Sequence, residues 1–251
     1  MLEHSLHDAL HDVLLQLDNA ALAARRPVPR LLAVSKTQAA TAVAELARAG
    51  QLAFGENYVQ ETAAKQSVLA ESGMGLAALE WHLIGHLQSN KARDAARLFD
   101  WVQSVDRVSL VAALARHRGS ERAPLNVLVQ VNVDDEASKH GCRPEDVAML
   151  ADAVAGQPRL LLRGLMVIPT PYADIERRRP AFRRTRALFD DLRQQHPQLD
   201  TLSMGMSDDC AIAVAEGATM VRVGTALFGP RSRDEQPAAV EKRAGLGTWD
   251  S

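Results

Sequence analysis

The sequence predicts a single α/β fold, a (β/α)8 barrel of the TIM type with an extra helix at its N-terminus. Eight short apolar runs recur along the chain, and amphipathic stretches separate them. Continuous apolar strands that alternate with helices indicate a parallel sheet covered on both faces. The length of 251 residues suits one such barrel, which takes about 250 residues. The alternative is an open doubly wound sheet, but no GxGxxG fingerprint follows an early strand.

The elements follow one another in a regular order. Residues 5–24 place apolar side chains three and four positions apart, which predicts a helix, and Pro27 ends it. The predicted strands occupy residues 31–35, 52–55, 81–85, 101–105, 125–133, 160–168, 201–206 and 219–224. The predicted helices between them occupy residues 39–49, 60–69, 91–98, 107–116, 144–155, 180–195 and 208–216. We assign residues 1–230 to the barrel and expect the charged segment 231–251 to be a flexible tail.

Composition and charge exclude several classes of protein. The formal net charge of -2 gives no field that favours nucleic acid or an anionic membrane. No apolar run approaches the ~20 residues of a membrane span, and the start of the chain lacks the pattern of a secretory signal. An arginine cluster at residues 177–186 is interpreted as a solvated helix face. The two cysteines are far apart and form no CxxC pair. We therefore expect a cytoplasmic protein that binds neither nucleic acid nor membrane.

Lys36 is the first candidate functional residue. Active sites of parallel barrels lie where the strands end, at the C-terminal face, and Lys36 closes the first apolar run. Burial lowers the pKa of an ammonium group, and the free amine can then form a Schiff base with an aldehyde. A lysine at a strand end is equally compatible with a solvated surface residue.

The last two strand ends carry the residue types of a phosphate site. Ser207 follows the seventh strand, and Gly224 and Thr225 follow the eighth. Phosphate binds to exposed backbone N–H groups, hydroxyl donors and small residues that permit close approach, and barrels often bind it after strands seven and eight. The alternative for Ser207 is a plain helix N-cap.

Four further residues are candidates for ligand or metal contacts. Arg222 lies inside an apolar strand, so its charge needs either a ligand heteroatom or an ion pair with an acid such as Glu216. Asn57 is either a ligand to a ring hydroxyl or a turn residue. His82 and His86 are four residues apart, but a glycine intervenes and no third ligand lies at metal spacing. We expect no metal site there.

These segments together resemble the YggS/PROSC family of pyridoxal 5′-phosphate-binding proteins, also called the pyridoxal phosphate (PLP) homeostasis family. The resemblance covers nearly the whole chain up to about Arg231 and is more specific than any single motif. The matching strings are AVSKTQ (33–38), FGENYVQE (54–61), WHLIGHLQSNK (81–91), GLMVIP (164–169), LSMGMSDD (202–209) and VRVGTALFG (221–229).

The resemblance implies a fold-type III PLP-binding barrel like the N-terminal domain of alanine racemase. Lys36 would be the Schiff-base lysine, and Arg222 would face the pyridine nitrogen. The residues implied for the phosphate are Ser207, Gly224 and Thr225, with Ser203 nearby, and those implied for the rest of the pocket are Asn57, His82 and Met166.

The departures from alanine racemase bear on activity. That enzyme has a second, β-rich domain, whereas we expect one barrel to account for this chain. Each subunit of the enzyme also contributes a catalytic tyrosine to its partner's site, and neither Tyr58 nor Tyr172 matches that tyrosine. Racemisation needs an acid or base on each face of the bound imine, and Lys36 serves one face. A smaller departure is His140, in the loop at 138–141.

The resemblance therefore implies a PLP carrier that acts in intracellular PLP homeostasis, without established catalytic turnover. We expect a monomer that delivers PLP to PLP-dependent apoenzymes. The alternatives are a PLP-dependent racemase-like enzyme of small amino acids and a barrel that binds another phosphorylated metabolite without a Schiff base.

Overall fold

The fold is a closed barrel of eight parallel strands in sequential order, which confirms the predicted (β/α)8 architecture. The structure is a computed structural model and describes residues 5–73, 79–134, 136 and 139–229. Strand β8 pairs with β1 and closes the barrel, with Leu32 opposite Arg222. The strands are β1 (Arg30–Val34), β2 (Ala53–Glu56), β3 (Glu80–Leu83), β4 (Trp101–Val105), β5 (Leu125–Val131), β6 (Leu160–Val167), β7 (Thr201–Met206) and β8 (Met220–Val223).

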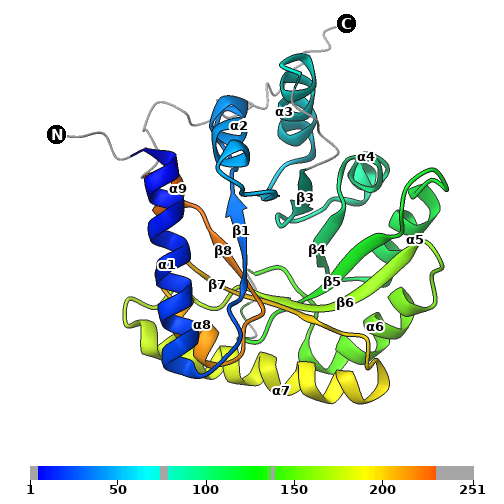
Figure 1. The fold of residues 1–251 in the computed structure, drawn as a ribbon. Helices are drawn as coiled ribbons and strands as arrows, with labels where there is room; N and C mark the ends of the chain where they lie inside the picture. Colours follow the sequence, from blue (N-terminus) through cyan, green and yellow to red (C-terminus); the bar gives the residue numbers. More distant parts are fainter. Residues whose placement is uncertain (1–4, 74–78, 135, 137–138, 230–251) are drawn as a thin grey trace, which may run out of the picture.

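Helices surround the barrel, and the extra N-terminal helix packs outside it against α8 and α9 (Figure 1). The α-helices of the described residues are α1 (Leu6–Ala24), α2 (Ala40–Arg48), α3 (Val59–Glu71), α4 (Ala92–Leu98), α5 (Val108–His117), α6 (Val147–Ala155), α7 (Arg179–Gln195), α8 (Cys210–Ala215) and α9 (Thr225–Phe228). Short 3-10 helices are η2 (Ser89–Lys91), η3 (Pro144–Asp146) and η4 (Ile175–Arg178). In the described part of the chain, every helix is too short or too polar to cross a membrane.

The structure differs from the predicted elements mainly at their ends. The helices predicted at 91–98 and 144–155 each begin with a 3-10 turn, η2 and η3 respectively. The strand predicted at 125–133 ends at Val131, where the chain turns to pair with Cys142. Helix α9 was not predicted, because four residues are too few to show a helical period. The predicted tail at 231–251 lies outside the described residues.

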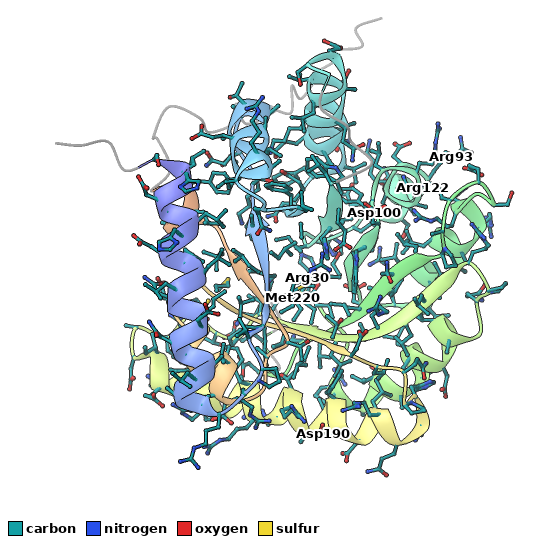
Figure 2. All side chains as sticks on the ribbon, viewed as in Figure 1. Arg30, Arg93, Asp100, Arg122, Asp190 and Met220 are labelled. Atoms are coloured by element: carbon teal, nitrogen blue, oxygen red, sulfur yellow. The ribbon has the colours of Figure 1, made fainter. Side chains whose placement is uncertain are left out.

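Ion pairs connect neighbouring elements around the outside of the barrel. Arg122 Nη2 lies 2.7 Å from Asp100 Oδ1, just before β4 (Figure 2). In the arginine cluster, Arg178 is buried and pairs with Asp209 at 2.7 Å. The exposed members Arg183 and Arg184 pair with Glu216 and Asp134. These arginines therefore have structural ion pairs with acids of neighbouring elements.

Gly164 in β6 provides a stability test of the barrel. Its φ is +149°, and a Cβ added there would lie 1.9 Å from the backbone oxygen of Thr201 on the adjacent strand β7. The β6–β7 pairing therefore requires glycine at this position.

We expect Gly164→Ala to lower the free energy of unfolding by about 3 kcal/mol or more, because the clash is with backbone that cannot rotate away. Urea denaturation measures the loss. Gly156→Ala is the matched control, because its Cβ would only reach ordinary contact with Asp152 O at 3.4 Å. Equal effects of the two substitutions would contradict the register described here.

Candidate functional site

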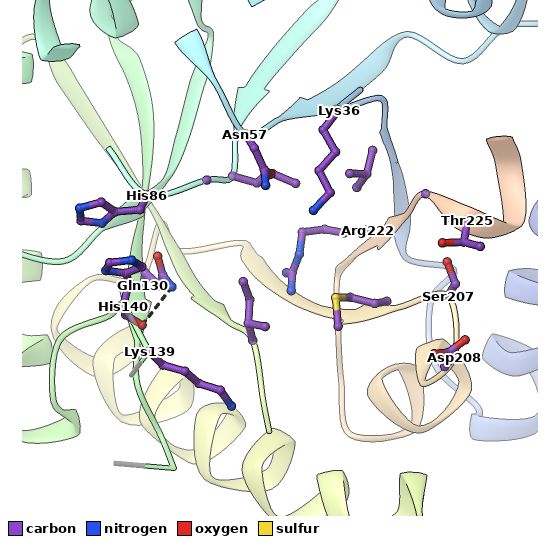
Figure 3. Close-up of a pocket in the computed structure, with 16 residues that line it drawn as sticks. Lys36, Asn57, His86, Gln130, Lys139, His140, Ser207, Asp208, Arg222 and Thr225 are labelled. Atoms are coloured by element: carbon purple, nitrogen blue, oxygen red, sulfur yellow. Dashed lines mark hydrogen bonds between the residues drawn. The ribbon is translucent and has the colours of Figure 1, made fainter. Parts of the chain in front are cut away.

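A pocket of about 610 Å³ opens at the C-terminal ends of the strands (Figure 3). This volume lies in the range of about 300–1,000 Å³ found for small-molecule sites. The pocket contains six of the nine residues expected at the site. They are Lys36, Asn57, Ser207, Arg222, Gly224 and Thr225. The fold thus brings together strand ends that are far apart in the sequence.

The segment that carries Lys36 is held in an unusual backbone conformation. Thr37 has φ = 65°, a left-handed conformation that costs a non-glycine residue roughly 1–2 kcal/mol. Its N–H donates to Glu61 Oε1 at 2.5 Å, and the N–H of Gln38 donates to Ser35 O at 3.0 Å. The turn that presents Lys36 is therefore maintained by one bond within the turn and by one from Glu61 outside it.

A buried charge network lies directly behind this turn. The ammonium group of Lys65, on α3, donates to Ser35 O at 2.6 Å, to Glu56 Oε1 at 2.7 Å and to Glu61 Oε1 at 2.7 Å. Ser35 Oγ also donates to Glu56 Oε1 at 2.6 Å. All three N–H donors of Lys65 are thus used, and they join β1, β2 and α3 behind Lys36.

Glu56 is the most deeply buried acid of the network, with a side chain that is 0% exposed against 24% for Glu61. Its carboxylate is fully buried, and burial raises its pKa although Lys65 opposes the shift. Its second oxygen, Oε2, is buried and has no hydrogen-bond partner within the described residues. Sequence reasoning missed this network. The signal was Lys65 itself, which lies on the buried stripe of α3 with Thr62 and Leu69.

The other three expected site residues lie below the pocket, inside the barrel. Ser203, His82 and Met166 are fully buried and do not line the pocket. Met166 packs with Trp101 and Leu128. These side chains fill the barrel interior beneath the pocket and do not form its wall.

His82 and Ser203 belong to a chain of hydrogen bonds through the barrel interior. Arg222 Nη1 donates to Ser203 Oγ at 2.8 Å, and Ser203 Oγ donates to Gln103 Oε1 at 2.7 Å. The amide of Gln103 lies 2.8 Å from His82 Nδ1, and His82 Nε2 lies 2.5 Å from Glu80 Oε1. The chain thus connects the pocket with the N-terminal end of the barrel.

The protonation states of His82, Glu80 and Arg222 agree with their roles as donors and acceptors in this chain of hydrogen bonds. Burial lowers the pKa of His82, so its ring is neutral, accepting from Gln103 and donating to Glu80. Burial raises the pKa of Glu80, but the bond from His82 and the charge of Arg30 lower it to about 2. Burial lowers the pKa of Arg222 to about 10, so the guanidinium remains charged at neutral pH.

The structure distinguishes between the two interpretations of Arg222 and of Ser207. Glu216 pairs with Arg179 and Arg183, so the ion pair suggested between Glu216 and Arg222 is not present. Instead Arg222 Nη2 donates to Val167 O at 2.8 Å. Helix α8 begins at Cys210 with Asp209 as its N-cap, so Ser207 is not a cap and lines the pocket.

The loops that carry Asn57 and Ser207 are fixed by close packing and by an ion pair. A Cβ at Gly85 would lie 2.4 Å from Asn57 O, so only glycine permits the two loops to meet there. Asp209 Oδ1 accepts from the N–H of Met206 at 2.6 Å, and Arg178 holds its other oxygen. The loop after β7 is therefore anchored beside Ser207.

Sequence reasoning missed the wall of the pocket that faces Ser207 and Thr225. His86, Gln130, Lys139 and His140 line this wall (Figure 3). Gln130 Nε2 donates to His140 O at 3.1 Å and fixes the loop after β5. The wall combines the loop after β3 with the end of β5 and the loop that follows it, and only the folded barrel brings these segments together.

The comparison with known proteins agrees with this geometry. Residues 13–232 match the family described as alanine racemase, N-terminal domain. The pyridoxal phosphate homeostasis protein of Pseudomonas aeruginosa (strain PAO1) is 54% identical over 201 residues, 80% of this chain and 84% of that protein. The chain belongs to the pyridoxal phosphate homeostasis protein family. A relative of the same name from Escherichia coli (strain K12) is 50% identical, over 80% of this chain and 85% of that protein.

Solved structures show the same barrel in this family. PipY of Synechococcus elongatus PCC7942, solved with PLP bound, is 38% identical, with a TM-score of 0.77 over 90% of this chain and 100% of that chain. Alanine racemase of Corynebacterium glutamicum is 18% identical, with a TM-score of 0.62 over 95% of this chain and 62% of that chain. The likeness to the racemase concerns the fold alone.

The buried network of this homeostasis-family chain gives a prediction about stability. Lys65→Met removes the cation beside fully buried Glu56 and leaves an uncompensated carboxylate. We expect a loss of about 3–5 kcal/mol in the free energy of unfolding at pH 7. Lys91→Met is the control, because it alters a lysine of η2 outside the network, and we expect a change within about 0.5 kcal/mol.

The same variant should show a characteristic pH dependence. The folded-state pKa of Glu56 lies above its ordinary value of 4.5, so between these two values the folded chain binds more protons than the unfolded chain. The free energy of unfolding therefore rises as the pH falls through this window. Because Lys65 opposes the rise in the pKa of Glu56, removal of Lys65 widens this pH window. The loss in the free energy of unfolding caused by Lys65→Met should therefore become smaller between pH 8 and pH 5. A loss that does not change with pH would contradict the raised pKa assigned to Glu56.

Proposed function

We propose that this protein binds PLP as a Schiff base on Lys36 and serves in intracellular PLP homeostasis. The observation that carries the proposal is the convergence of a strand-end lysine, two hydroxyls, a glycine and a buried guanidinium on one pocket. The names of its relatives and the PLP-bound structure of PipY support it.

The residues of the pocket fit the cofactor. PLP supplies an aldehyde carbon that reacts with amines and a pyridine ring that acts as an electron sink. Lys36 holds the aldehyde carbon, Ser207 and Thr225 donate hydroxyls to the phosphate, and Gly224 permits its close approach. Gly224 already lies against the carbonyl of Val34, so a side chain there would have little room. Asn57 binds the ring hydroxyl.

Arg222 favours storage of the cofactor over turnover. Its guanidinium is fully buried and charged, and we assign it to the pyridine nitrogen. A positive charge at that nitrogen keeps it unprotonated, which makes the ring a weaker electron sink. His82 and Ser203 act through Arg222, whose position they fix from below, and Met166 forms the apolar floor beside them.

We propose that the protein acts as a carrier without catalytic turnover, as a monomer in the cytoplasm, and passes PLP to PLP-dependent apoenzymes. The names of the relatives denote homeostasis and not an enzymatic reaction. Among the described residues, neither Tyr58 nor Tyr172 lines the pocket.

The second candidate function is a racemase-like enzyme. One observation favours it, because the imidazoles of His86 and His140 line the same pocket as Lys36 and an imidazole is a common acid–base group. A pocket that binds another phosphorylated metabolite without a Schiff base is the third possibility.

The first test is the spectrum of the protein with PLP, before and after borohydride reduction. We expect a visible Schiff-base band that reduction abolishes, with the pyridoxyl mass on the peptide that contains Lys36. Lys36→Ala should lose the band yet retain weaker, phosphate-held binding. A Schiff base on Lys139, the other lysine in the pocket, would contradict the assignment of Lys36. No band at all would favour the third candidate.

Deuterium exchange distinguishes the carrier from the enzyme. We incubate the PLP-loaded protein with L-alanine or D-alanine in deuterated water and measure deuterium at Cα by mass spectrometry. For a carrier, we expect no more deuterium than with Lys36→Ala at the same PLP concentration. Exchange that depends on Lys36 and is lost in His86→Ala or His140→Ala would establish the racemase-like alternative.

A further inference from the structure

Three side chains with metal-binding atoms meet beside the pocket, where His86 and His140 line the wall opposite Ser207 and Thr225. They are His86 after β3, Asp106 directly after β4 and His140 in the loop after β5. One ligand atom from each lies within 4.8 Å of the others. No sequence motif indicates this group, because Asp106 and His140 are 34 positions apart and only the closure of the barrel makes them neighbours.

The two imidazoles and the carboxylate are close neighbours. The rings of His86 and His140 are stacked with centroids 3.7 Å apart and planes 15° from parallel. His86 Nδ1 lies 3.8 Å from Asp106 Oδ2. Because the lone pair of an imidazole nitrogen lies in the ring plane, binding of one ion by both rings requires a ring to rotate out of this stack. Two imidazoles and a carboxylate are a ligand set that Zn²⁺ prefers.

Bonds from neighbouring residues orient Asp106. Arg107 Nη1 donates to Asp106 Oδ1 at 2.6 Å, and Arg107 Nη2 donates to Leu87 O at 2.8 Å. Asp106 Oδ1 is thus occupied, and Oδ2 is the oxygen turned toward His86. Orientation of a ligand by such outer partners is characteristic of metal sites. Arg107 is a cation near the site, but its charge is offset by the carboxylate that it binds.

The loop that carries His140 is anchored on β5. The N–H of Cys142 donates to Gln130 O at 2.9 Å, and the N–H of Asn132 donates to Cys142 O at 2.9 Å. With the bond from the Gln130 side chain to His140 O, these contacts fix the backbone at His140 and at Cys142, two residues after it. His140 therefore faces His86 from a constrained loop.

The three side chains are accessible to an ion. The side chain of His86 is 33% exposed and that of Asp106 is 11% exposed, so an ion can reach them without unfolding a loop.

We propose that His86, Asp106 and His140 bind a divalent transition-metal ion of the Zn²⁺ class at the wall of the pocket. Three protein ligands leave one tetrahedral position of the ion for water or for a small molecule in the pocket. The proposal concerns these three residues and does not depend on PLP binding. In a protein that binds PLP as well, the ion and the cofactor would occupy different walls of one cavity.

The test is isothermal titration of ZnCl₂ into chelator-treated protein, without PLP and again with PLP bound. We expect one ion per chain with micromolar or tighter affinity. His86→Ala and His140→Ala should each weaken binding tenfold or more. His196→Ala is the matched control, because His196 Nε2 lies 3.0 Å from Asp152 Oδ1 without a second imidazole beside it, and its affinity should equal that of the unaltered protein.

A second measurement places the ion. Anomalous diffraction at the zinc edge, from crystals grown with ZnCl₂, should show a peak between the three side chains. Unchanged affinity in both histidine variants, a loss of equal size in His196→Ala, or a peak elsewhere would overturn the proposal. Since the side chains of His86 and His140 are exposed, we expect circular dichroism to show that both variants are folded. A folded variant of either histidine that binds zinc as tightly as the unaltered protein would overturn the proposal.

Discussion

The position of Lys36 depends on the buried ammonium group of Lys65. That group joins Ser35, Glu56 and Glu61, and Glu61 in turn holds the left-handed backbone of Thr37. Lys36 lies between two residues that are fixed in this way, so its amine is directed into the pocket by contacts on the far side of the strand. A buried charge network of this kind contributes little net stability, but it specifies one conformation, and its loss leaves a carboxylate buried without a cation.

The second constraint is the charge of Arg222. A guanidinium enclosed by the barrel has no carboxylate among the direct hydrogen-bond partners described for it, and its donors bind Ser203 Oγ and Val167 O. The chain of hydrogen bonds through Gln103 and His82 ends at ionised Glu80, on the other end of the barrel. A buried polar chain is favourable only when each member has its partners. The interior of this barrel is therefore organised around the pocket as well as around apolar packing.

The fold could be predicted because its signals are local. Apolar runs mark the strands, helical periods lie between them, and eight repeats of the unit favour closure into a barrel. The end of the β5 strand and helix α9 were missed because a pairing with Cys142 and a four-residue helix leave no periodic pattern. At the site, Lys36 and Ser207 could be found from strand ends, and Arg222 from its charge inside an apolar strand. His82, Met166 and Ser203 could not be distinguished from residues of the pocket wall, since successive inward-facing layers of a barrel are only two residues apart along a strand. Lys65 and the His86–His140 contact depend on packing between distant segments.

The most direct measurement is a crystal structure of the protein grown with PLP. We expect continuous density from Lys36 Nζ to the cofactor, the phosphate beside Ser207 and Thr225, Arg222 at the pyridine nitrogen, and the Lys65 network unchanged behind the lysine. PLP bound elsewhere on the barrel, or bound in this pocket with Lys36 turned away from it, would contradict the claim that the buried network presents Lys36 to the cofactor.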